Sequence, residues 1–90
     1  MARIKCFKDQ KIAIYIYGER YGKHHEKHVL VLKADEDCQY GFDGKPIKNS
    51  ARLRNKNDDD TVSEWIKSHA AELDCAWEKI NCGENPGYID

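Results

Sequence analysis

Residues 61–82, TVSEWIKSHAAELDCAWEKINC, decide the fold, because their apolar side chains recur at the spacing of an α-helix. At 100° per residue they form one continuous stripe, made of Val62, Trp65, Ile66, His69, Ala70, Leu73, Ala76, Trp77 and Ile80. Thr61 and Glu64 fit a capping box at the start, and Gly83 suits the C-terminal cap. We therefore predict one long amphipathic helix at about 61–82.

The half of the chain before this helix carries strand patterns instead. Residues 11–17, KIAIYIY, alternate β-branched and aromatic side chains, and 28–34 are apolar on both faces. Shorter strand patterns cover 2–7 and 38–42, and Asp43-Gly44 predicts a hairpin that leads into a return strand at 46–48. The sequence thus predicts an α+β fold: a small antiparallel sheet of about four to five strands packed against one long C-terminal helix.

We expect a single domain over residues 1–90, with the sheet at about 2–49, a basic loop at about 50–60 and the helix at about 61–82. A helix is about 10–12 Å across and covers only part of one face of such a sheet. Ile12, Ile14 and Ile16 share one face of their strand, and Tyr15 and Tyr17 share the other. One apolar face therefore lacks cover within the chain.

An uncovered apolar face usually marks an interface. The sequence therefore predicts a protein-interaction module that acts through an exposed sheet face, as a homodimer or with a small cognate protein partner. The alternative is that the tyrosines of this face tolerate water and the monomer is sufficient.

The composition limits the classes of partner. Charged residues make up 34% of the chain, yet the net charge is only −1, so no general attraction to nucleic acid or to anionic membranes is expected. The longest apolar run, 12–17, is far shorter than a membrane span, and the N-terminus lacks the apolar core of a signal peptide. We expect a cytoplasmic protein. Four cysteines without a C-x-x-C pair are expected to be free thiols.

Residues 21–29, YGKHHEKHV, hold three of the four histidines and are the strongest candidate for chemistry. His24, His25 and His28 could bind a transition metal, with Glu26 or His69 as a fourth ligand. His24 and His25 are adjacent, however, and adjacent side chains of an extended segment point in opposite directions. Two solvated loop histidines are the alternative, and we expect neither a metal nor another cofactor.

An enzyme would use His28 or His69 as a general base oriented by Glu26, as in a metal-independent ribonuclease. The sequence contains no Ser-His-Asp pattern, no glycine-rich phosphate loop and no zinc-protease motif. We therefore do not expect catalysis, but keep a histidine-based enzyme or metal-binding protein as the alternative function.

A basic stretch between Gly44 and Asn57 could contact phosphates. Its cations are Lys45, Lys48, Arg52, Arg54 and Lys56. No aromatic residue offers a base a stacking surface there, and three aspartates follow at 58–60. A solvated surface loop is the expected outcome, without nucleic acid.

The order of these motifs resembles a known family. An Ile14-Tyr15-Ile16 strand, a histidine-rich segment that ends in His28-Val29, Gly44 with Ile47, and a Trp-Ile-x-x-His-x-x-Glu-Leu-x-x-x-Trp helix at 65–77 are followed by Gly83 and Ile89. This chain resembles the small bacterial domain-of-unknown-function 4160 family over nearly its whole length. Members typically carry a His-x-Pro-Pro-His-x-His-Val loop, onto which His28 maps. The family's gene neighbourhoods imply a toxin–antitoxin-like pairing with another small protein.

Overall fold

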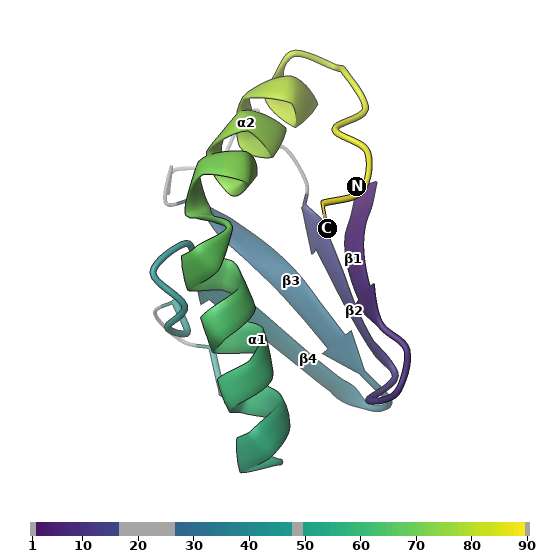
Figure 1. The fold of residues 1–90 in the computed structure, drawn as a ribbon, viewed down its shortest axis with the longest axis vertical. Coiled ribbons are helices and arrows are strands. Elements are labelled where there is room, and N and C mark those ends of the chain that lie inside the picture. The colour runs from purple at the N-terminus through teal and green to yellow at the C-terminus, as the bar shows by residue number, and fades with distance from the viewer. Residues whose placement is uncertain (1, 17–26, 48–49, 90) are drawn as a thin grey trace.

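The sheet is an antiparallel meander in which each strand pairs with the next one along the chain. The computed structural model describes residues 2–16, 27–47 and 50–89, and within them the order is β1-β2-β3-β4. The strands are β1 (Ala2–Phe7), β2 (Ile12–Ile16), β3 (His28–Lys33) and β4 (Glu36–Gly41), and Figure 1 shows two helices on one side of them. The predicted α+β class and antiparallel sheet are confirmed.

Tight turns join the strands at one end of the sheet. Lys11 and Ala34 adopt left-handed backbone conformations, with φ of 58° and 52°, as they close the β1–β2 and β3–β4 turns. The strand predicted at 38–42 begins earlier, because Glu36 and Asp37 already pair with Lys33 and Leu32 in the β3–β4 ladder.

The return strand predicted after the Asp43-Gly44 hairpin is reduced to an isolated bridge between Tyr40 and Pro46. The segment still follows the outer edge of β4. The Ile47 N–H donates to the Gln39 carbonyl at 3.0 Å, and the Gln39 N–H donates to Ser50 Oγ at 2.7 Å. Residue 48, the last of the predicted strand, lies outside the described residues. The edge of β4 is thus covered by residues of its own chain.

The long helix is two helices, α1 (Lys56–Ser68) and α2 (Ala70–Asn81). The predicted start at Thr61 is wrong. Asn55 is the N-cap, and its side chain accepts a hydrogen bond from the Asp58 N–H at 3.2 Å. Thr61 instead donates to the Asn57 carbonyl inside the helix. The first helical turn is entirely polar, so the apolar periodicity could not reveal it.

A bend at His69 separates the helices without ending the hydrogen-bond ladder. The His69 N–H bonds the carbonyls of Trp65 and Ile66, and the Leu73 N–H bonds the His69 carbonyl. His69 Nδ1 also lies 2.8 Å from the Trp65 carbonyl, which its own N–H already uses. A side chain that inserts into the ladder in this way is a recognised cause of helix kinks. No helix in the described part of the chain is long and apolar enough to cross a bilayer.

The helices cover the isoleucine face of the sheet. Ile12, Ile14 and Ile16 have no exposed surface, and neither do Val62 and Ile66 from α1. The rest of the core comes from the same sheet face, from the loop before α1, from both helices and from the C-terminal segment: Ile4, Val29, Val31, Cys38, Tyr40, Leu53, Trp65, Leu73, Ala76 and Ile89. Ile89 also donates its N–H to the Ile4 carbonyl at 2.7 Å, which holds the C-terminal segment beside β1.

The hairpin after β4 touches α1 through glycine. Gly44 has a φ of +81°, and Ser63 Oγ donates a hydrogen bond to its carbonyl at 2.5 Å. A Cβ at this position would lie 2.8 Å from the Ser63 carbonyl oxygen, which is closer than real Cβ contacts. Glycine is therefore required here by both backbone conformation and space.

We expect Gly44→Ala to lower the free energy of unfolding by about 2–4 kcal/mol, from left-handed strain plus the clash with α1. Gly83→Ala is the matched control, because Gly83 has a φ of +83° and a Cβ added there would meet nothing within 4 Å. It should lose only about 1 kcal/mol. Urea unfolding followed by tryptophan fluorescence measures both, and equal losses would contradict the close packing at Gly44.

Candidate functional site

The sheet face opposite the helices is an apolar surface that neither helix covers (Figure 1). The strand register aligns two rows of side chains across it. One row is Arg3, Tyr15, Leu30 and Gln39, and the other is Cys6, Ala13, Leu32 and Asp37. We call these eight residues the open face. Neither helix reaches it, because the alternate residues of the same strands carry the buried core.

The centre of the open face is apolar and its ends are polar. Tyr15 and Leu30 are paired across β2 and β3, as are Ala13 and Leu32, and all four are half-buried by their neighbours. The face therefore presents a small apolar band on the two middle strands. This answers the question that the sequence left open: the helices cover the isoleucine face, and no helix of the described residues covers the face of Tyr15.

Tyr88, from the C-terminal segment, extends the row of the open face that contains Arg3. Tyr88 is the large apolar residue most exposed among those described, at 57%, and its ring lies 5.7 Å from the Arg3 guanidinium carbon. This distance suits a cation–π contact. Sequence reasoning missed Tyr88, because the segment after Pro86 carries no strand or helix periodicity.

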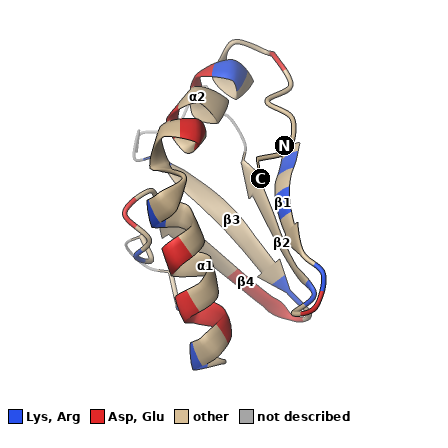
Figure 2. Ribbon diagram, viewed as in Figure 1, with Lys and Arg blue, Asp and Glu red and all other residues tan. Residues whose placement is uncertain are grey.

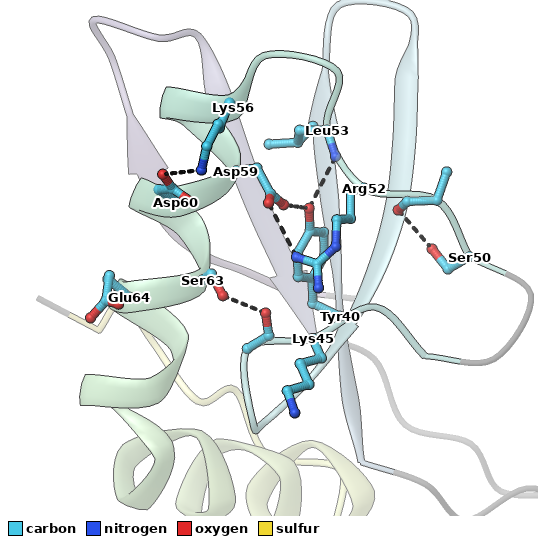
Figure 3. Close-up of polar contacts among 12 residues, drawn as sticks. Tyr40, Lys45, Ser50, Arg52, Leu53, Lys56, Asp59, Asp60, Ser63 and Glu64 are labelled. Atoms are coloured by element: carbon cyan, nitrogen blue, oxygen red, sulfur yellow. Dashed lines mark hydrogen bonds and ion pairs between the residues drawn. The ribbon is translucent and has the colours of Figure 1, made fainter.

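A polar cluster joins α1 to β4. Like Tyr88, it was not predicted from the sequence. The Tyr40 hydroxyl donates to Asp59 and accepts the Leu53 N–H at 3.0 Å, while Arg52 Nη1 lies 3.2 Å from the other Asp59 oxygen (Figure 3). Burial, and then the hydrogen bond to Asp59, raise the pKa of Tyr40 well above its ordinary value. The phenol therefore stays protonated and acts as a fixed hydrogen-bond link.

The neighbouring carboxylate has a partner of its own. Asp58 pairs with Lys33 at the end of β3, and both Asp58 and Asp59 are buried. These two aspartates thus connect α1 to two strands. Every polar group of this cluster is used within the chain, which indicates a structural connection.

The two described candidate histidines lie in separate aromatic groups. The ring of His28, which is buried, lies 5.8 Å from that of Trp77. His69 stacks on Trp65 at 4.7 Å. These tryptophans are about 18 Å apart along the helical path. The expected approach of His69 to His28, as base or as metal ligand, therefore has no support in these contacts.

The remaining candidates of the histidine segment, His24, His25 and Glu26, lie outside the described residues. Among the residues that are described, no group of three or more His, Cys, Asp or Glu side chains could hold a metal ion.

Three described cations of the basic stretch are paired with acids. Arg52 contacts Asp59, Arg54 contacts Asp35 at 2.8 Å, and Lys56 contacts Asp60 at 3.4 Å. Lys48 lies outside the described residues. The three pairs reduce the charge available for phosphates and agree with the solvated-loop interpretation.

All four cysteines are free thiols, as expected from their spacing. Cys38 is buried, and burial raises the pKa of its thiol. Cys6 is half-buried on the open face, and Cys75 and Cys82 are exposed on or after α2. A cavity of about 330 Å³ lies between α2 and the C-terminal segment; its lining is Ala71, Glu72, Cys75, Ala76, Lys79, Pro86 and Ile89.

Comparison with known proteins adds no assignment: no family model, no curated protein and no solved structure matches this chain. The fold and site define a small α+β protein with helices on one sheet face and an open face on the other. The resemblance to the domain-of-unknown-function 4160 family stays a prediction.

We expect Tyr40→Phe to lower the free energy of unfolding by about 1–3 kcal/mol at pH 7, because Asp59 and the Leu53 N–H each lose a buried partner. The loss should shrink above about pH 10. There the unfolded chain releases the Tyr40 proton while the folded chain keeps it, so wild-type stability falls as pH rises.

Urea unfolding of both proteins at pH 7, 9 and 11 measures this difference. Tyr88→Phe is the control, since Tyr88 is exposed and should change stability little at any of these pH values. A difference in unfolding free energy between wild type and Tyr40→Phe that stays constant up to pH 11 would contradict the raised pKa of Tyr40.

Proposed function

We propose that this protein is a protein-interaction module that binds a protein partner through the open face. The observation that carries the proposal is the one-sided cover of the sheet. Ile12, Ile14 and Ile16 are fully buried under α1 and α2, whereas Tyr15 and Leu30 lie on the opposite side, which neither helix covers, and are only half-buried. An apolar band bounded by polar residues is typical of a protein contact surface.

The composition of the band supports this proposal. Tyrosine is enriched at interfaces because it buries a large ring and still has a hydroxyl for hydrogen bonding. Tyr15 lies in the middle of the band, and Leu30 and Leu32 supply flat apolar surface beside it. Gln39 and Asp37 on β4 and Arg3 on β1 form a polar rim. The band is narrow, so a modest affinity is expected.

A partner protein also agrees with how the molecule uses its other polar groups. Arg52, Arg54 and Lys56 of the basic stretch and the carboxylates of Asp58 and Asp59 are paired internally. The open face is the surface that the described residues leave without such internal use. A small cognate protein or a second copy of the chain would both cover it.

Site-specific photocrosslinking tests the proposal without assuming the partner. A photoreactive phenylalanine in place of Tyr15 should give one discrete crosslinked product in the cells that carry the gene. The same group in place of Ser68, which is exposed on α1, is the control and should give none. No product from position 15 would contradict the interaction module.

A substitution on the same band checks the contact surface independently. Leu30→Lys should remove the product of the position 15 probe, because a charged group would then need to be desolvated in the interface. Ser68→Lys, which adds the same charge on the helix side, should leave that product unchanged. Far-UV circular dichroism and urea unfolding establish that both variants are folded.

A further inference from the structure

The two outer strands of the sheet carry opposite charges on the open face. Arg3 on β1 shares a row with Tyr15, and Asp37 on β4 shares a row with Leu32. Both charged side chains are exposed. Figure 2 shows the separation along the ribbon, with cationic residues on β1 and acidic residues at the start of β4.

Neither charge is neutralised within the described part of the chain. Arg3 lies over the Tyr88 ring, which leaves its positive charge without an acidic partner. Arg54 pairs with Asp35 and Glu36 but not with Asp37. The open face therefore has one cationic end, one anionic end and an apolar centre, which makes it complementary to a copy of itself.

Symmetry decides how two copies would meet. A two-fold axis that crosses the strands would place β1 against β1 and bring the two Arg3 side chains together. An axis that runs approximately along the strands would place β1 against β4. Arg3 and Asp37 lie in adjacent rows, two residues apart along the strands, so a tilt of this axis from the strand direction brings Arg3 of each copy opposite Asp37 of the other. Edge-to-edge pairing is disfavoured, because Ile47 and Ser50 occupy the edge of β4 and the edge of β1 would meet its own cations.

The area of the open face sets the strength of such a contact. Four strands about 4.8 Å apart and about six residues long cover roughly 400 Å² per copy. This is at the small end of specific protein interfaces, so a reversible dimer is expected and not an obligate one. The chain's net charge of −1 adds almost no long-range repulsion between copies.

We propose that the partner of the open face is a second copy of this chain, in a two-fold dimer whose axis is tilted from the strand direction and whose ends are closed by two Arg3–Asp37 pairs. The inference rests on the proposed function and adds to it the occupant and its orientation. A second copy explains why β1 and β4 carry opposite charges on the open face. An unspecified partner does not explain this.

Sedimentation velocity between about 10 µM and 1 mM tests the dimer. The wild-type chain should shift from monomer to dimer over this range, and Leu30→Lys should stay monomeric. Arg3→Asp and Asp37→Arg should each weaken dimerisation about tenfold or more, because each turns two attractive pairs into two repulsive ones. The double variant should recover the wild-type dissociation constant within about threefold.

Lys5→Asp is the matched control for Arg3→Asp. It makes the same charge change on the same strand, but Lys5 lies 5.3 Å from the Phe7 ring, which packs against Trp65 on the helix side. The dimer dissociation constant of this variant should stay within about twofold of the wild-type value. Equal weakening by Lys5→Asp and Arg3→Asp would overturn the proposed charge pairing.

The failures of the two proposals are distinguishable. A chain that stays monomeric at 1 mM, with a position 15 crosslink to a protein of another mass, overturns the second copy and leaves the interaction module standing. A dimer that Leu30→Lys abolishes but that neither charge variant weakens overturns the orientation. A dimer that Leu30→Lys leaves intact overturns both proposals, since another surface then carries the contact.

Discussion

Two adjacent carboxylates fix how the helices lie on the sheet. Asp58 and Asp59 are buried where α1 meets β3 and β4, and a buried carboxylate is costly unless a cation or a donor meets it. Lys33 forms an ion pair with Asp58. Asp59 accepts a hydrogen bond from Tyr40 and forms an ion pair with Arg52. Because the partners come from different strands and the loop, only one rotation of α1 satisfies both. That rotation directs Val62 and Ile66 at the isoleucines and leaves the face of Tyr15 without cover.

Much of this architecture could be predicted from alternation and periodicity alone. The strands at 2–7 and 28–33, the two-sided apolar pattern of 12–16 and the amphipathic helix all follow from local spacing. The helix start could not be read, because its first turn is polar and Asn55 caps it. The bend at His69 depends on one ring nitrogen meeting one carbonyl, which periodicity does not record.

The candidate site, too, could be predicted from the sequence only in part. The sequence indicated that some apolar sheet face would lack cover, but the choice of face depends on contacts such as Tyr40–Asp59, which join residues 19 apart. The residue types gave a stronger signal for the histidines, yet His28 and His69 each contact a different tryptophan. Both rings pack against aromatic side chains, and their roles as ligands or bases stay predictions.

The order of the elements along the chain also affects how the protein is made. Synthesis completes β4 about 40 residues before the end of α2, which at ordinary ribosome speeds corresponds to roughly 2–8 s. During that interval the meander can already pair, since each strand's neighbour is next in sequence. The isoleucine face and the Tyr15 face of the nascent sheet are then both exposed to water. The nascent sheet is therefore the stage most exposed to aggregation, and emergence of residues 56–81 from the ribosome ends that exposure for one face only.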